Sequence, residues 1–320
     1  KILPYTEPIL TTFHCSAITE IAGNGSKQIN NWMMNKYLRW RSIMDFTKNF
    51  NHIITISDSM IWNITIFESK RLNKEQASNN IHEIISGLIN KDYYIFLAGI
   101  DDYYITGKNN YLKKHFAHDG IILGYDDSDN TYEMAAYKLN QQFGRFSFPQ
   151  ADLENSINST YIPDSLIILG LKAPKNNHIE LDVTGIKKLF AEYLFPEKYA
   201  ITPNDGFAYG LNVYSHLQKY ITLIETRELL DTLDNRAFSL LNEHKRFVLK
   251  LLSYLCLELK ITSAAPHLYE KIVNQSEILR LLSLKYNVTK NKIILVKMNK
   301  KISIIREEER KILSDFIGLL

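Results

Sequence analysis

Two residues in the amino-terminal half of the chain could together perform thiol chemistry. Cys15 follows Thr11 and Thr12, either of which could cap a helix that begins near the cysteine. The exposed amides and dipole at a helix start favour the thiolate, and the backbone N–H of Cys15 could serve as an oxyanion donor. His118 precedes an apolar run that is typical of a strand, and a histidine there could face the cysteine helix as its base. The alternatives are that Cys15 is a small buried apolar residue and that His118 is a histidine of a surface loop.

The residue that would orient the imidazole has no obvious position. The strand after the histidine strand ends in Met-Ala-Ala, and neither Ala135 nor Ala136 can hold a ring nitrogen. Asn140 is the nearest amide in sequence. Asp101, followed by Asp102, ends the preceding strand and could reach His118 from the side, so we assign the orienting role to Asp101.

Further side chains near this pair could bind a substrate. We take His14, Tyr103 and Tyr104 as the lining of a substrate cleft, although paired tyrosines in half-buried strands also serve as packing. A metal site is not expected, because the nearby histidines His115 and His118 belong to no closed ligand set at zinc spacing. The glycines match neither a dinucleotide motif nor a phosphate loop, so no cofactor is expected.

Periodicity predicts helices and strands that could position these residues. We expect helices at 15–21, 28–46 and 75–90, and strands at 93–100, 120–126, 131–137, 144–148 and 165–171. Helical spacing then continues over 183–194, 208–224, 226–242, 243–259 and 265–286. The fold class expected is α+β, with a Cys/His domain over 1–165 and a mostly helical domain over 166–320.

Composition narrows the functional classes. The 320 residues include 38 Lys and Arg against 35 Asp and Glu, and the cations are spread along the chain, so nucleic acid is a poor partner. Two cysteines are too few for a disulfide framework and suit a reducing compartment. Neither a membrane span nor a signal peptide is visible, and we expect a cytoplasmic protein with no membrane partner.

Four motifs, in this order and spacing, carry a resemblance to a known family. They are FHC at 13–15, GIDDYYI at 99–105, HFAHDGIILGYDD at 115–127 and FAYGLNVY at 207–214. Together they resemble the family named after butirosin biosynthesis protein H, N-terminal type, over most of the chain. The resemblance implies a fold related to papain-like and bacteriocin-leader-cleaving cysteine peptidases, with Cys15 as nucleophile and His118 as base. The chain departs from the wider papain-like pattern because residues 1–14 contain no Gln for an oxyanion hole.

The resemblance also implies a reaction. Members occur with nonribosomal peptide and polyketide assembly enzymes, and the namesake transfers an acyl group from a carrier protein to an aminoglycoside amine. By analogy, we expect a cysteine acyltransferase of antibiotic biosynthesis whose partners are an acyl or peptidyl carrier protein and a small-molecule amine. A hydrolase or peptidase acting on a peptide-like product, and a non-catalytic scaffold, are the alternatives. The sequence does not determine the oligomeric state, and a homodimer remains open.

Overall fold

The chain forms two compact units in the computed structural model, which describes residues 1–43, 53–56, 66–78, 80–161, 166–174, 178–198, 207–229 and 231–320. Unit 1 comprises Lys1–Asn30 and Met60–Ile179, and unit 2 comprises Asn31–Ser59 and Glu180–Leu320. About 50% of the protein is helical and 19% is strand, and its sheets are antiparallel. The expected α+β class is therefore confirmed at this level.

Unit 1 is built on one antiparallel sheet of six strands. Its strands are β3 (Glu68–Asn73), β4 (Tyr94–Asp101), β5 (Ala117–Asp126), β6 (Thr131–Tyr137), β7 (Phe143–Pro149) and β8 (Ile167–Lys172). They lie in the order β3-β8-β4-β5-β6-β7. β4 and the middle of β5 are apolar and buried because both faces of the sheet are covered at its centre.

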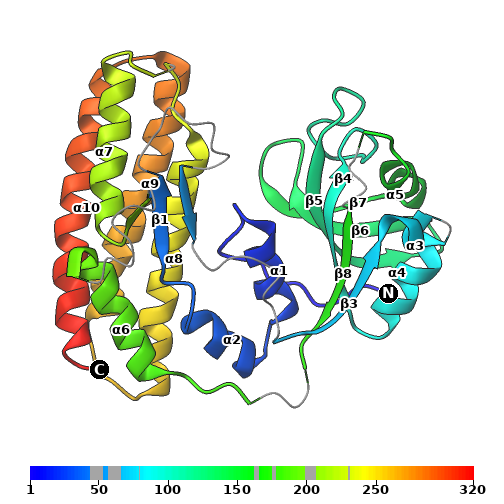
Figure 1. Cartoon of the computed structure of the whole chain (residues 1–320), viewed down its shortest axis with the longest axis horizontal. Coiled ribbons are helices and arrows are strands. Elements are labelled where there is room, and N and C mark those ends of the chain that lie inside the picture. The colour runs from blue at the N-terminus through cyan, green and yellow to red at the C-terminus, as the bar shows by residue number, and fades with distance from the viewer. Residues whose placement is uncertain are drawn as a thin grey trace. The chain divides into compact units, whose positions relative to one another are not determined.

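Helices cover the two faces of this sheet. These helices are α1 (His14–Ala22), α3 (Lys74–Ser78), α4 (Ile81–Asn90) and α5 (Gln150–Ile157). α1 packs against β4 and β5 on one face, and α3, α4 and α5 lie on the other face (Figure 1). α4 shows how sequence determines this placement, since Ile81, Ile85 and Leu88 share one helical stripe and are buried.

A bulge in β4 bends the end of the strand that leads to the predicted site. The register between β4 and β5 shifts between Leu97 and Ile100. Within the bulge Gly99 has a φ of 90°, which a residue with a Cβ rarely adopts. Its backbone N–H donates to Asp119 Oδ1 at 3.2 Å, so a side chain of β5 holds the bulge.

Unit 2 combines helices with a small sheet. Its helices are α6 (Val183–Leu194), α7 (Asn212–Glu225), α8 (Asn235–Glu258), α9 (Ala265–Thr289) and α10 (Ile293–Ile317), and the residues of α2 (Lys27–Met34) are divided between the two units after Asn30. α9 packs between α8 and α10, and α10 also contacts α6 and α7. The sheet has the order β2-β1-β9, formed by β2 (Ile54–Ile56), β1 (Trp40–Ile43) and β9 (Phe207–Tyr209).

Most predicted elements are confirmed, but the expected helix over 28–46 is wrong. The helix ends at Met34, and residues 40–43 form β1, which pairs with β2 and β9. The predicted helices 226–242 and 243–259 are replaced by one helix, α8, whose cap Asp234 accepts from the N–H of Arg236.

The expected boundary near residue 165 also differs from the observed units. β8 follows that position but lies between β3 and β4 in the sheet of unit 1. Segment 31–59 belongs to unit 2, although it precedes most of unit 1 in the sequence. The chain therefore passes between the units more than once.

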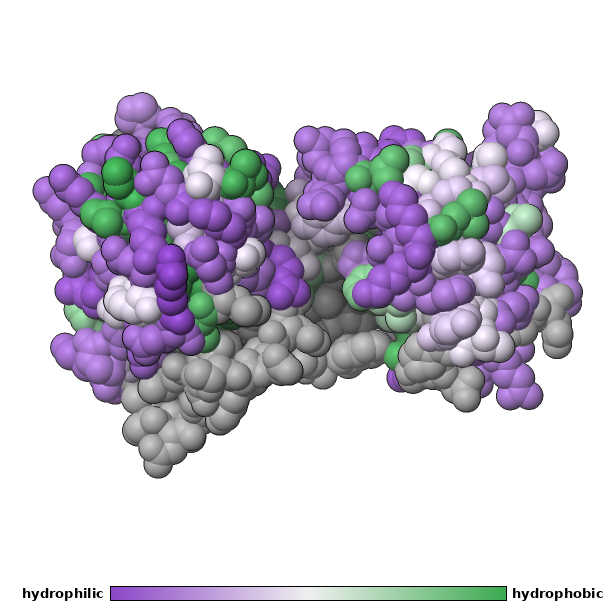
Figure 2. Space-filling view, turned by 90° about the horizontal axis from the view of Figure 1, so that it is seen from above, coloured by the Kyte–Doolittle hydropathy of each residue, from purple (hydrophilic) through white to green (hydrophobic). Residues whose placement is uncertain are grey.

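The surface seen in Figure 2 is mostly hydrophilic. On that face hydrophobic residues form small separate groups between polar ones, as expected of a solvated protein surface. Among the described helices, none is long and apolar enough to span a bilayer.

Candidate functional site

The residues predicted to act together lie where β4 and β5 end. Ile100 pairs with His118 and Asp101 with Ala117, and the N–H of Asp102 donates to the carbonyl of Phe116 at 3.0 Å. Because side chains alternate along a strand, Asp102 and His118 share one face of the sheet and Asp101 faces the other.

Three ionisable side chains meet on the first of these faces. Asp102 Oδ2 lies 3.6 Å from His118 Nδ1, and Lys108 Nζ lies 3.5 Å from the same nitrogen. Lys108 Nζ also lies 3.1 Å from Asp102 Oδ1 and donates to the carbonyl of Asp119 at 3.1 Å. The side chains of Lys108 and Asp102 are 0% and 5% exposed, whereas that of His118 is 33% exposed. His118 is thus the member of this cluster that an incoming molecule can reach.

Burial and mutual charge shift the protonation of all three groups. Burial and then the neighbouring Lys108 ammonium lower the pKa of His118 to about 4. Burial raises the pKa of Asp102, and the Lys108 ammonium opposes that shift. Burial lowers the pKa of Lys108, opposed by the charge of Asp102. At neutral pH His118 is therefore a neutral imidazole beside a buried ion pair.

Asp101 contacts a different histidine. Its Oδ2 lies 2.7 Å from His115 Nδ1 and accepts from Ser159 Oγ at 2.6 Å. Its Oδ1 accepts from the N–H groups of Tyr103 and Phe116, at 3.1 and 3.2 Å. Burial would raise the pKa of Asp101, but these hydrogen bonds outweigh it and lower the pKa. The carboxylate assigned to orient His118 thus holds His115, and Asp102 stands beside His118 instead.

The two tyrosines expected to line a cleft pack around this second histidine. The ring of His115 stacks on Tyr103 with a centroid distance of 4.2 Å and on Tyr161 at 3.7 Å. Tyr104 lies 5.1 Å from Tyr103 in an edge arrangement. These rings hold His115 in one orientation.

The predicted nucleophile is the second residue of α1, as expected for a cysteine in a first turn. The N-cap is Phe13, so the expected cap at Thr11 or Thr12 is wrong. The side chains of Cys15 and His14 lie outside the part of the chain that the structure describes. α1 itself contacts β4 and β5, the strands that lead to Asp102 and carry His118.

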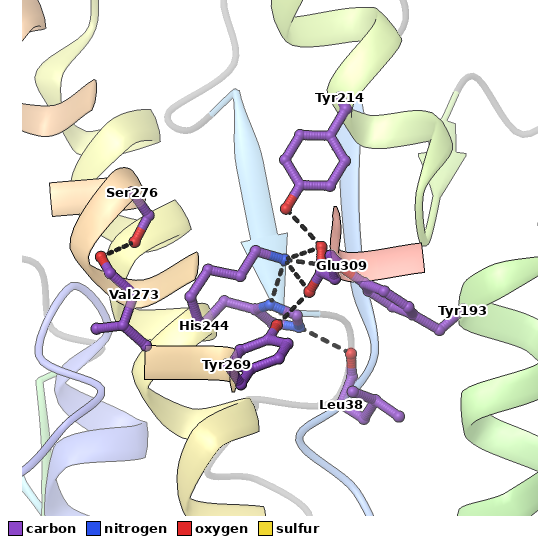
Figure 3. Close-up of polar contacts among 9 residues, drawn as sticks. Leu38, Tyr193, Tyr214, His244, Tyr269, Val273, Ser276 and Glu309 are labelled. Carbon is purple, nitrogen blue, oxygen red and sulfur yellow. Dashed lines mark hydrogen bonds and ion pairs between the residues drawn. The ribbon is translucent and has the colours of Figure 1, made fainter. Parts of the chain in front are cut away.

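A second buried polar cluster lies within unit 2 (Figure 3). Lys245 Nζ lies 3.0 Å from Glu309 Oε1 and donates to Tyr193 Oη at 2.7 Å. Glu309 also accepts from the hydroxyls of Tyr193, Tyr214 and Tyr269. Both charged side chains are 0% exposed.

The same cluster includes a neutral histidine. His244 Nδ1 accepts from Lys245 at 3.2 Å, and Nε2 donates to the carbonyl of Leu38 at 2.9 Å. Burial and then the Lys245 charge hold the pKa of His244 well below its usual range. Because its buried side chains form hydrogen bonds with one another, this cluster stabilises the packing of α6, α7, α8, α9 and α10.

Sequence reasoning missed Lys108 and the Lys245–Glu309 pair. Lys108 stands in the run TGKNN, which has the composition of a solvated turn, so nothing local marks it as buried. In α8, by contrast, a helix register would have placed Lys245 on the stripe of Leu241 and Val248, both of which are buried.

Comparisons with known proteins leave these geometric observations as the basis for function. No family model matches the chain, and no curated protein matches it. Among the described residues, no group of three or more His, Cys, Asp or Glu side chains is arranged to hold a metal ion.

Proposed function

We propose that unit 1 is a papain-like cysteine acyltransferase in which Cys15 is the nucleophile and His118 the base. It would move an acyl group from a carrier-protein thioester to a small-molecule amine. The observation that carries the proposal is the arrangement at the ends of β4 and β5, where a partly exposed imidazole stands beside a buried carboxylate on strands that α1 contacts.

The placement of α1 supports the pairing of Cys15 with His118. In papain-like enzymes a helix bearing the cysteine packs against a sheet bearing the histidine. Here the cysteine helix packs on the two central strands, and one of them carries the histidine near its start. This agrees with the resemblance to the butirosin biosynthesis protein H family.

The orienting role passes to Asp102 in this proposal. Asp101 lies on the opposite face and is engaged by His115 and Ser159, whereas Asp102 Oδ2 lies 3.6 Å from His118 Nδ1. The Ala135–Ala136 pair is buried in β6 and contributes no polar group. A carboxylate at the end of β4 would thus replace the residue that the next strand lacks.

The chemistry would proceed in two balanced steps. The Cys15 sulfur attacks the thioester carbonyl carbon, the bond from that carbon to the carrier sulfur breaks, and the carrier thiolate takes the proton that Cys15 gave to His118. The amine nitrogen then attacks the acyl-enzyme, an amide forms, the Cys15 sulfur leaves, and His118 receives the proton that the amine loses. We expect the reaction to take place in the cytoplasm, because the nucleophile must stay reduced.

Intact-mass analysis tests the proposal. The protein is mixed with acyl thioesters of a pantetheine-type carrier-arm mimic, beside Cys15→Ala and Cys256→Ala variants. We expect a gain of one acyl group in the wild type and in Cys256→Ala, and none in Cys15→Ala, because burial raises the pKa of the Cys256 thiol.

Discharge of the acyl-enzyme then separates transfer from hydrolysis. Loss of the acyl group that accelerates with added amine supports the transferase, and loss at one rate regardless of amine supports a hydrolase. A gain that survives in Cys15→Ala, or no gain with any donor, would refute the proposed nucleophile.

A further inference from the structure

We propose that Lys108 is a positioning residue that keeps His118 neutral and decides which of its ring nitrogens carries the proton. The inference rests on the proposed function for its catalytic meaning, but not for its geometry. Lys108 lies in the connection between β4 and β5, seven residues after the end of β4, and its side chain is entirely buried.

The contacts of the ammonium carry the argument. Lys108 Nζ has three N–H bonds and three acceptors around it: the carbonyl of Asp119, Oδ1 of Asp102 and Nδ1 of His118. A protonated amine cannot approach a protonated ring nitrogen in this way. When Lys108 donates to Nδ1, His118 must carry its proton on Nε2.

Asp102 competes for the same ring nitrogen. Its Oδ2 lies 3.6 Å from Nδ1, close to the 3.5 Å that separates Nδ1 from Lys108 Nζ. If Nδ1 carries a proton, it donates to Asp102, and Nε2 becomes the acceptor that a base requires. Lys108 and Asp102 therefore favour opposite tautomers of His118.

The other carboxylates near His118 are engaged elsewhere and cannot take over the contact that Lys108 makes with the ring. Asp119 is its neighbour in β5, and the Asp119 carboxylate accepts from the N–H of Gly99. From α1, the titratable residues are His14 and Cys15, whose side chains are outside the described part, and Glu20, whose carboxylate accepts from the N–H groups of residues 9 and 10. Lys108 is a cation in contact with the ring.

This arrangement changes the resting state of the proposed site. In a thiolate–imidazolium pair the base is already protonated before substrate arrives. A cation beside Nδ1 opposes that state, so Cys15 would rest as a thiol. Its proton can pass to Nε2 only after His118 exchanges the contact with Lys108 for a hydrogen bond from Nδ1 to Asp102, the tautomer that frees Nε2 as the base. Lys108 would thus restrain the reactivity of the thiol when no acyl donor is bound.

NMR titration of His118 tests the inference without any activity. The variants are Lys108→Met, which removes the charge and keeps the length, and Lys114→Met, which removes an exposed charge from the same connection. His118→Gln assigns the resonance. Because burial is the larger cause of the lowered pKa of His118, we expect that pKa to rise by about 0.5–1 unit in Lys108→Met and by less than about 0.3 units in Lys114→Met.

The wild-type protein provides a second readout that needs no folded variant. ¹⁵N shifts of the His118 ring should show Nε2 protonated and Nδ1 as an acceptor, and the opposite tautomer would overturn the inference. An unchanged pKa of His118 in folded Lys108→Met would overturn it as well.

The outcomes also separate this inference from the proposed function. If His118 responds as expected but Cys15 never becomes acylated, the role of Lys108 stands and the acyltransferase fails. If Cys15 is acylated while the pKa of His118 is unchanged in Lys108→Met, the acyltransferase stands and the role of Lys108 fails.

Discussion

The buried pair of Lys245 and Glu309 gives a strong quantitative prediction about stability. In Glu309→Gln the ammonium of Lys245 keeps only neutral partners, the hydroxyl of Tyr193 and Nδ1 of His244. Breaking one half of a buried ion pair costs about 3–5 kcal/mol, because an uncompensated charge remains. We expect a loss of this size in the free energy of unfolding.

Removing the lysine instead should lower the free energy of unfolding by less. In Lys245→Met the carboxylate of Glu309 retains the hydroxyl donors of Tyr193, Tyr214 and Tyr269. Hydrogen bonds to a charged group contribute about 1.5–3 kcal/mol each, so we expect a loss of about 2–3 kcal/mol. The double variant buries no charge and keeps an amide for the hydroxyls, and its loss should be about 1–2 kcal/mol.

Urea unfolding followed by tryptophan fluorescence measures these changes, since the ring of Trp40 lies 4.1 Å from Lys245 Nζ. The three values give a coupling of about 3–7 kcal/mol between the two residues. Losses that simply add in the double variant would refute the reasoning.

The pH dependence of Glu309→Gln provides an independent check. Burial already lowers the pKa of Lys245 to about 8 in the wild type, where the charge of Glu309 opposes the shift. Loss of the carboxylate lowers this pKa further, so the unfolded chain of the variant binds the extra proton. The free energy of unfolding should then rise with pH between 7 and 9, by up to about 1.4 kcal/mol per unit. A flat profile for this variant would show that Lys245 finds another counter-ion.

Three further changes test other parts of the fold. Gly124→Ala should lower the melting temperature of unit 1, because a Cβ there would lie 2.5 Å from a backbone oxygen. At Gly87, in α4, an added Cβ has no atom within 4 Å, so Gly87→Ala should leave the free energy of unfolding unchanged or raise it by about 0.5–1 kcal/mol in thermal unfolding. Asp101→Asn should cost about 2–4 kcal/mol in urea unfolding, since the carboxylate accepts from four donors, and its contribution in the wild type should be lost as pH falls through its lowered pKa. His244 is neutral when folded, so the free energy of unfolding should fall as pH drops below about 6.5, and His244→Gln should flatten that slope.

Local sequence pattern predicted the elements that depend on local physics. Apolar runs bounded by turns predicted β4 to β8, and helical spacing predicted α6 at its observed bounds, Val183–Leu194. The segment after Met34 was misread because Trp32 and Trp40 continue a helical spacing into β1. Its partners lie in β2 and in distant β9, so tertiary pairing overrides the local pattern there.

The candidate site was predictable in its types of residue but not in its pairing. The sequence placed His118 at the start of a strand and Asp101 and Asp102 at the end of the one before. The bulge at Gly99 sets which side chains face each side of the sheet beyond it. A shift of one residue would place Asp101, and not Asp102, on the face of His118. Lys108 was invisible because its burial arises from the folded connection and not from its neighbours in sequence.

The interleaving of the two units has a consequence for how the protein is made. The segment with Trp40 leaves the ribosome early, but Leu38 meets His244, 206 residues later in the chain. At about 5–20 residues per second, synthesis of that interval takes about 10–40 s. During this time the indole of Trp40, which is 1% exposed in the folded protein, is not yet covered. The strands of the unit 1 sheet, which lie between Trp40 and α8 in the sequence, are synthesised in the same interval. We therefore expect the nascent chain to bind chaperones that cover exposed aromatic segments. We also expect a chain truncated before α8 to aggregate, because Trp40 then stays exposed.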